Sequence, residues 1–299
     1  MSRAMKVGYQ LLDVFTDKRL SGNPLAVVPE ADHLLDDEMQ AIANEFNLSE
    51  TVFLRRPQNA RNTAGLRIFT PHTELPFAGH PTIGAAVVLG LEHRSSAVRL
   101  EERVGLVTAL VERIDKRTGE ARFTLPQLPE RAGKAPEVRD VALALGLDTE
   151  EIGCGVYHPD VFSAGNLFYL VPVRDAGALK RIVLNEGHWR HAFPLGRHSA
   201  YVFTQTPDEP DNDFAARKLT PGYLEDPGTG SAAAALIGLL AEKADLSTGQ
   251  GDYVLRQGHE IGRPCRITMQ LRKEDDALVH AAIGGRAVMV GEGVLDLGD

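Results

Sequence analysis

Two apolar segments constrain the fold of this chain more than any other feature of its sequence. Residues 82–89 and residues 231–244 are predicted helices, built almost entirely from Ala, Val, Leu, Ile and Gly. Neither shows a polar face before its end, and a helix that is apolar all round is normally buried on every side. A sheet wrapped around each helix would bury it in this way, so the sequence predicts two strand-rich layers that each enclose one helix.

The same order of elements occurs twice along the chain. Each apolar helix follows a loop rich in Gly and Pro, and an amphipathic helix precedes it, at Leu35–Phe46 in the first half and near Asp175–Gly187 in the second. We interpret this as a degenerate duplication, with both helix N-termini opening toward a shared cleft between the domains. The length of 299 residues is about twice the ~150 typical of one domain, and the Pro-rich segment Leu125–Glu130 is the expected linker. Strands alternate with too few helices for a doubly wound parallel sheet.

The charge balance limits the partners of the chain. It has 32 Lys and Arg against 41 Asp and Glu, a net charge of −9, and no basic run. We therefore expect no nucleic acid and no membrane as partners, and an anionic ligand must be bound by local groups. No apolar stretch approaches the ~20 residues that span a bilayer, and residues 1–6 show no signal segment, so we expect a cytoplasmic protein. Cys154 and Cys265 fit neither a disulfide framework nor a zinc ligand set, and their roles stay open.

A glycine motif stands at the start of the second apolar helix. Residues 228–233, Gly-Thr-Gly-Ser-Ala-Ala, match a dinucleotide-binding pattern that requires a strand directly upstream. Glu225-Asp226-Pro227 predicts a turn there instead, so a Rossmann site is not expected. The first N–H groups of a helix, beside its positive dipole end, suit a carboxylate or phosphate. A plain glycine turn that allows close helix packing, with Ser231 as the N-cap, is the alternative that the residues leave open.

Three polar residues of the loop before the first apolar helix have the side-chain types of metal ligands. They are His72, Glu74 and His80. His72 and Glu74 also match the H-x-E of zinc deaminases, but those enzymes need a P-C-x-x-C pair, and Thr268 stands where the second Cys after Cys265 would be. A polar loop is the simpler interpretation, and we predict no metal and no cofactor.

Short segments distributed over nearly the whole chain resemble one known family. They are Gly22-Asn23-Pro24, Asn47-Leu48-Ser49-Glu50-Thr51, Arg67-Ile68-Phe69-Thr70-Pro71, residues 74–82, residues 225–233, and Gln257-Gly258 with Gly262-Arg263-Pro264. Through them the chain resembles the phenazine-biosynthesis PhzF-like family, whose members are similar in fold to diaminopimelate epimerase. The resemblance implies an α+β fold of two similar domains, each a mixed, largely antiparallel β-barrel around a central helix, with the active site between them. We expect the N-terminal barrel domain at residues 1–126 and the C-terminal one at 127–299, with the last strand free to return to the first domain.

The resemblance also assigns a site. It implies that Glu50 is the acid/base residue, and that His80 and Asp226 contact polar groups of the substrate and share in proton transfer. A small carboxylate-bearing substrate is expected. The predicted substrate-binding residues are Ser49, Gly79, Gly228, Thr229, Gly230 and Ser231.

Epimerases of this fold use one cysteine before each central helix. Ala78-Gly79-His80 and Glu225-Asp226-Pro227 occupy those places here, which excludes a two-thiol mechanism.

The predicted reaction is a cofactor-independent proton shift between carbons of a small cyclic or unsaturated amino or carboxylic acid. One carboxyl group can remove an activated C–H proton and return it to another carbon on the same face. An epimerase or racemase in which His80 or Asp226 acts opposite Glu50 is the first alternative, and a non-catalytic binding protein on the same fold is the second. The resemblance further suggests a homodimer.

Overall fold

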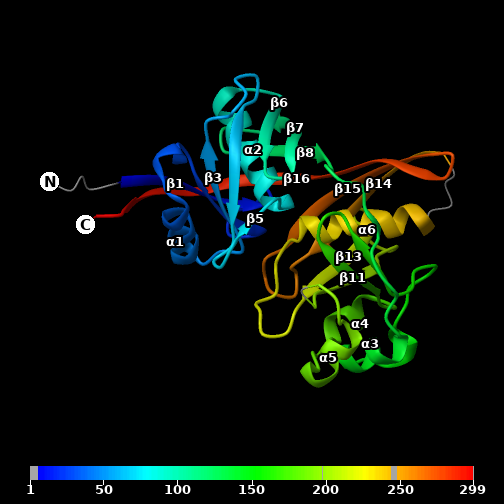
Figure 1. Ribbon diagram of the computed structural model, residues 1–299. Coiled ribbons are helices and arrows are strands. Elements are labelled where there is room, and N and C mark those ends of the chain that lie inside the picture. Colours follow the sequence, from blue (N-terminus) through cyan, green and yellow to red (C-terminus); the bar gives the residue numbers. More distant parts are fainter. Residues whose placement is uncertain (1–5, 197, 244–247, 299) are drawn as a thin grey trace. The chain divides into compact units, whose positions relative to one another are not determined.

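The computed structural model describes residues 6–196, 198–243 and 248–298 (Figure 1). The chain divides into two compact units, residues 1–126 with 284–299 and residues 127–283. No helix among the described residues is long and apolar enough to cross a membrane.

Eight strands of the first unit close into a barrel. Their order is β16–β1–β2–β3–β4–β6–β7–β8, and β8 is again next to β16. The pairs β2–β3 and β4–β6 are parallel, whereas β1–β2, β3–β4, β6–β7, β7–β8 and β1–β16 are antiparallel. The elements are β1 (Lys6–Val14), β2 (Asn23–Val28), a short 3₁₀ helix (Ala31–His33), α1 (Asp36–Phe46), β3 (Thr51–Arg55), β4 (Ala64–Phe69), β5 (Glu74–Leu75), α2 (Gly79–His93), β6 (Ala97–Glu102), β7 (Gly105–Arg113), β8 (Thr118–Thr124) and, from residue 284 onward, β16 (Ala277–Asp296). The predicted α+β class with a mixed, largely antiparallel barrel is confirmed for this unit.

Helix α2 occupies the interior of this barrel (Figure 1). It packs against β1, β2, β3, β6, β7 and β8, and every residue from Gly79 to Gly90 is buried. A Cβ at Gly84 would lie 2.3 Å from the Leu25 side chain, so strand β2 approaches the helix more closely than any larger residue would allow. The all-round apolar pattern therefore predicted the burial correctly. The helix itself is longer than the predicted 82–89.

The second unit repeats the strand pairing of the first. Its strands follow the order β9–β10–β11–β12–β13–β14–β15–β16. From β10 to β15 the pairs alternate antiparallel, parallel, antiparallel, parallel, antiparallel, the same succession as from β1 to β7. The elements are β9 (Glu130–Arg131), α3 (Val138–Leu145), a 3₁₀ helix (Thr149–Glu151), β10 (Asp160–Ser163), β11 (Leu167–Pro172), α4 (Ala176–Arg181), α5 (Glu186–Ala192), β12 (Ala200–Gln205), β13 (Phe214–Leu219), α6 (Gly230–Lys243), β14 (Gly249–Gln257) and β15 (Cys265–Glu274).

The second sheet differs from the first at its edge. Strand β9 has only two residues, both exposed and charged, and among the described residues it pairs with β10 alone. The closed ring of the first unit is therefore not repeated there. Helix α6 is nevertheless buried from Ala232 to Ala241 against β9, β10, β11 and β15. Ala244, the end of the predicted helix, lies outside the described residues.

The amphipathic helix predicted near Asp175–Gly187 is wrong in its extent. The structure has two short helices, α4 and α5, separated at residues 182–185. The N–H groups of Val183 and Asn185 donate to the carbonyls of Leu145 and Ala144 at the end of α3. Backbone bonds to another helix thus replace the intrahelical bonds that one continuous helix would need.

Candidate active site

Glu50 and His80 meet in the first unit. Helix α1 ends at Phe46, its C-cap Asn47 turns the chain with a left-handed backbone (φ 50°), and Glu50 directly precedes β3. His80 is the second residue of α2. Its Nδ1 lies 3.3 Å from Glu50 Oε2, and the side chains are 5% and 18% exposed. A carboxyl group and an imidazole in contact, largely shielded from water, can pass a proton between them.

Asn23 gives this pair a second contact that the sequence did not reveal. It is fully buried at the start of β2, and its Nδ2 lies 3.4 Å from the same His80 Nδ1. When Nδ1 carries a proton it donates to Glu50 Oε2, and when it does not it accepts from the Asn23 amide. The position of one proton therefore selects the partner of His80 Nδ1.

The start of α2 corrects one prediction. The helix was expected to begin at Thr82, with its first N–H groups available there, but it begins at Gly79 after the N-cap Ala78. The Thr82 N–H already donates to the Ala78 carbonyl at 3.2 Å. Because Pro81 has no N–H, the amide donors of this first turn are those of Gly79 and His80.

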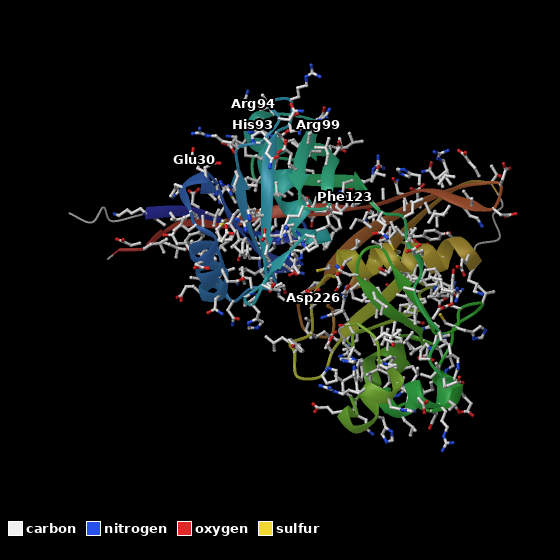
Figure 2. The ribbon with its side chains drawn as sticks, viewed as in Figure 1. Glu30, His93, Arg94, Arg99, Phe123 and Asp226 are labelled. Carbon is white, nitrogen blue, oxygen red and sulfur yellow. The ribbon has the colours of Figure 1, made fainter. Side chains whose placement is uncertain are left out.

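Asp226 belongs to the second unit, on the loop between β13 and α6 (Figure 2). Thr229 Oγ1 donates a hydrogen bond of 2.6 Å to its Oδ2. Thr229 Oγ1 also accepts from Gln257 Nε2 at 3.0 Å, so the single hydroxyl hydrogen is directed at Asp226. That oxygen of Asp226 is therefore an acceptor, fixed in place by its neighbour.

Gln257, at the end of β14, organises this loop. Its Nε2 also donates to the Asp226 carbonyl at 2.7 Å, and its Oε1 accepts from the Thr229 N–H at 3.0 Å and from the Tyr201 hydroxyl at 2.9 Å. All donor and acceptor positions of the buried amide are thus used. Burial, together with the negative charge of Asp226, raises the pKa of Tyr201 well above its usual value, so this hydroxyl stays a donor.

An ion pair anchors the other end of the loop. Arg217 donates two hydrogen bonds, of 3.0 and 2.7 Å, to the Glu225 carboxylate, and both side chains are largely buried. A third guanidinium bond reaches the Leu179 carbonyl at 3.1 Å. The bonds to Glu225 raise the pKa of Arg217, so the guanidinium stays charged at neutral pH. Asp226 therefore follows a residue whose side chain is fixed by a two-bond ion pair.

The remaining predicted binding residues lie at the helix starts or beside Glu50. Helix α6 begins at Gly230, one residue before the predicted Ser231, and Gly228, Thr229 and Gly230 are buried. The Ala233 N–H donates to the Thr229 carbonyl, as the first intrahelical bond requires. Gly79 is buried, whereas Ser49 is exposed. The structure thus brings Glu50 together with His80 in one unit, and Asp226 together with residues 228–231 in the other.

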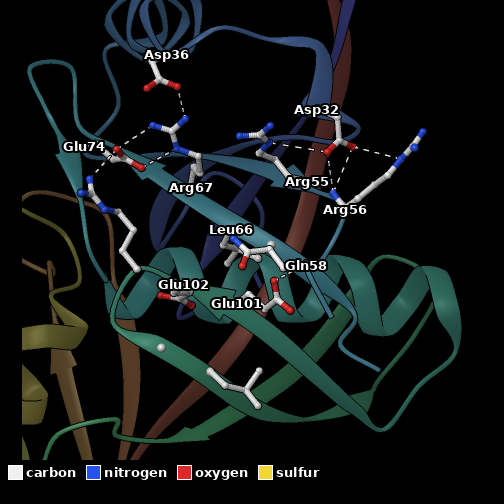
Figure 3. A pocket seen from close by; sticks show the side chains of 14 residues that line it. Asp32, Asp36, Arg55, Arg56, Gln58, Leu66, Arg67, Glu74, Glu101 and Glu102 are labelled. Atoms are coloured by element: carbon white, nitrogen blue, oxygen red, sulfur yellow. Dashed lines mark hydrogen bonds and ion pairs between the residues drawn. The ribbon is translucent and has the colours of Figure 1, made fainter. Parts of the chain in front are cut away.

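A pocket of about 750 Å³ opens on the first unit, and its lining does not include Glu50 or His80 (Figure 3). Arg67 and Arg103 line it, and both donate to Glu74, which was considered above as a metal ligand. His72 is exposed. Among the described residues, no three or more His, Cys, Asp and Glu side chains are grouped so that they could hold a metal ion.

Comparison with known proteins identifies the family. The family model "Phenazine biosynthesis-like protein" matches residues 12–293. This chain belongs to that family. An uncharacterised isomerase of Mesorhizobium japonicum is 40% identical over 296 residues, covering 96% of this chain and 98% of the relative. The trans-2,3-dihydro-3-hydroxyanthranilate isomerase of Pseudomonas aeruginosa is 33% identical over 294 residues, covering 95% and 98%.

A solved structure supports the fold. The PhzF-family phenazine biosynthesis protein of Bacillus anthracis superposes with a TM-score of 0.85 at 23% identity, covering 97% of this chain and 99% of that one. The predicted family is therefore confirmed, and so is the predicted enzyme class, an isomerase.

Two contacts of the site escaped the sequence analysis. Asn23 and Gln257 both lie in segments that carried the family resemblance, yet neither was assigned a role. A polar residue next to a turn Gly or Pro is common in any loop, so only their buried contacts with His80 and with the Asp226 loop distinguish them.

Proposed function

We propose that this protein catalyses a cofactor-independent proton shift on a small cyclic or unsaturated amino or carboxylic acid, with Glu50 as the base that removes the proton and returns it. The observation that carries the proposal is the 3.3 Å contact between Glu50 and His80 in a largely buried setting. The relative named trans-2,3-dihydro-3-hydroxyanthranilate isomerase, at 33% identity, supports a substrate of that chemical class.

The role of Glu50 follows from its partner. A carboxylate that has taken a proton from carbon must hold it until delivery, and a neighbouring imidazole can accept or stabilise it meanwhile. His80 can do so because Nδ1 exchanges Glu50 for the Asn23 amide when its own proton leaves. No metal or organic cofactor is required for this step.

In the second unit, we propose that the start of α6 binds the substrate carboxylate. The N–H groups of the first turn, from Gly230 to Ala232, precede the first intrahelical bond and lie at the positive end of the helix dipole. Asp226 would repel that carboxylate, so its proposed partner is an amino or hydroxyl group of the substrate. We call the Glu50–His80 pair one half-site, and Asp226 with the start of α6 the other. In this proposal both half-sites act on the same substrate molecule.

The first test is deuterium incorporation. Trans-2,3-dihydro-3-hydroxyanthranilate is incubated in D₂O with wild type, with Glu50→Gln and with Glu45→Gln, an exposed glutamate of α1. We expect wash-in with wild type and Glu45→Gln and none with Glu50→Gln, with circular dichroism unchanged. Exchange retained by Glu50→Gln would remove Glu50 from the role. Chiral analysis of the products separates a proton shift from epimerisation, since only an epimerase scrambles the stereocentre.

The second test asks whether both half-sites hold one ligand. Glu50→Gln should bind the probe without turning it over, so calorimetry can measure its affinity directly. Adding Asp226→Asn to that variant should weaken binding, because a donor on the ligand loses its acceptor. Equal affinity of the two variants would separate Asp226 from the site. A sulfate soak of crystals should place the anion beside residues 228–231, and an anion bound elsewhere with only water at this turn would refute the carboxylate assignment.

A further inference from the structure

Glu102 is a carboxyl group inside the first barrel to which the proposed mechanism gives no role. It is the last residue of β6, where Val98, Leu100 and Glu102 alternate toward the interior. Its neighbour Glu101 faces outward and accepts hydrogen bonds from the Gln58 and Asn59 N–H groups. Glu102 is 8% exposed, so its carboxyl group lies on the side of the barrel that holds α2.

The contact of Glu102 with α2 indicates the protonation state of this carboxyl group. Thr82 Oγ1 lies 2.8 Å from Glu102 Oε1 and 2.8 Å from the carbonyl oxygen of Ala78, the N-cap of α2. A hydroxyl has one hydrogen and cannot donate fully to both oxygens. Both contacts can be full hydrogen bonds when Glu102 is protonated, because Glu102 then donates to Thr82 and Thr82 donates to the Ala78 carbonyl.

The other oxygen of Glu102 supports the same protonation state. Glu102 Oε2 is buried and has no hydrogen-bond partner among the described residues. An ionised carboxylate with an unsatisfied oxygen is costly to bury, whereas a neutral acid is far less so. Burial raises the pKa of Glu102 to about 8, although the Thr82 bond opposes the shift.

The charged groups near Glu102 are engaged elsewhere. The other charged residues that line the same pocket are Asp32, Asp36, Arg55, Arg56, Arg67, Glu74, Glu101 and Arg103 (Figure 3). Arg55 and Arg56 both pair with Asp32. Arg67 pairs with Glu74 and Asp36, and Arg103 pairs with Glu74. On α2, His80 is in contact with Glu50. Among the described residues, neither Arg67 nor Arg103 forms an ion pair with Glu102, so a proton rather than a cation keeps this carboxyl group neutral.

We propose that Glu102, as a neutral carboxylic acid, is a positioning residue that fixes the first turn of α2 through Thr82, and thereby the orientation of His80. The inference rests on the proposed role of His80. Ionisation of Glu102 turns the Thr82 hydroxyl from Ala78 toward the carboxylate and releases the N-cap carbonyl from this bond. The first turn, which carries Gly79 and His80, then shifts with the charge of a residue that does not touch the substrate.

Nuclear magnetic resonance tests the inference without turnover. The protein is labelled with ¹³C at the glutamate carboxyl and ¹⁵N at the backbone, and the Glu102 signal is assigned by its loss in Glu102→Gln. We expect a titration midpoint near pH 8 for Glu102, and a transition with the same midpoint in the amide shifts of Gly79, His80 and Thr82. Glu102→Gln should remove that transition, and Glu112→Gln, an exposed control on β7, should retain it.

Thr82→Val provides the second variant, since it keeps the shape of the side chain and removes the hydroxyl. Glu102 should still titrate in it, but residues 79–82 should no longer follow. A Glu102 midpoint near 4.5, or a transition in residues 79–82 that persists in Glu102→Gln, would overturn the proposal. The latter outcome would assign the transition to His80 itself.

Activity provides a separate readout. With the hydroxyanthranilate probe, kcat of wild type should fall on the alkaline side with the Glu102 midpoint, and Glu102→Gln should move that fall to higher pH. An unmoved alkaline fall in an active Glu102→Gln would contradict the positioning role. If no variant turned over the probe, the proposed substrate would fail while the magnetic resonance result still decided the role of Glu102.

Discussion

Replacement of Glu102 by Gln should change the stability of the protein in a pH-dependent way. The pKa of Glu102 is about 8 in the folded chain, against 4.5 for an ordinary glutamate. Between these values the folded state keeps a proton that the unfolded chain has released, so the free energy of unfolding falls as pH rises. One pKa unit corresponds to about 1.4 kcal/mol, so a shift of roughly 3.5 units lowers stability by about 5 kcal/mol once the pH exceeds 8.

Gln has nearly the same shape as a neutral Glu and does not titrate. The difference in unfolding free energy between Glu102→Gln and wild type should therefore move in favour of the variant by about 4 kcal/mol from pH 5 to pH 8, and then level off. Well below pH 4.5 Glu102 is protonated in both states, and the pH dependence of the difference vanishes. All other groups titrate alike in the two proteins, so the difference isolates Glu102.

Urea unfolding at pH 5, 6, 7, 8 and 9, followed by circular dichroism, measures this difference. Glu112→Gln serves as the exposed control and should follow wild type throughout. The single tryptophan, Trp189, lies buried in the second unit, so its fluorescence shows whether that unit unfolds in the same transition. A difference that stays flat from pH 5 to pH 8 would refute the reasoning, because Glu102 would then ionise in the fold as it does in the unfolded chain.

Three further predictions concern the second unit and the assembly. Gln257→Leu should lower the free energy of unfolding by about 2–5 kcal/mol in urea titrations, since it leaves the Tyr201 hydroxyl and the Thr229 N–H buried without their acceptor. Gly258→Ala should cost about 2 kcal/mol or more and weaken ligand binding, because Gly258 has φ +78° and a Cβ there would lie 2.6 Å from the Pro227 carbonyl; unchanged calorimetric affinity would contradict this. Light scattering should report a homodimer, twice the 32.5 kDa of one chain, and a monomer mass would refute that expectation.

The central helices could be predicted because their apolar composition alone indicates that they are buried. A segment such as residues 82–89, with no polar face, has to be enclosed whatever surrounds it. The ends of these helices were predicted less accurately from the sequence. Gly79 and His80 read as loop residues next to Pro81, yet Pro is well suited to the first turn of a helix, where its missing N–H has no intrahelical partner.

Contacts between distant segments could not be derived from local pattern. Glu50, at a helix-to-strand joint, reads as an ordinary surface glutamate, and only the family resemblance assigned it a role. Its contact with His80 depends on how α2 lies inside the barrel. The predicted single helix near residues 175–187 failed for the same reason, because bonds from Val183 and Asn185 to α3 outweigh local helix propensity.

The inward position of Glu102 was predictable from the sequence, but we did not predict it. Val98 and Leu100 alternate with polar residues, so the strand period of two already directs residue 102 inward. A glutamate at an inward position of a closed barrel has to be neutralised by a cation or by a proton. With Arg67 and Arg103 paired to Glu74, the proton remains.

The two buried helices begin with different chemistry. The first turn of α2 offers an imidazole but loses one amide donor at Pro81, whereas the first turn of α6 offers the amides of Gly230, Ser231 and Ala232. Fixed amide donors stabilise a negative charge that does not change during the reaction, and an imidazole stabilises a proton that moves. On this basis α6 is suited to the substrate carboxylate and α2 to the proton transfer. In the proposed function, a duplicated pairing pattern with unequal helix starts would thus supply both the carboxylate-binding group and the proton-transfer group.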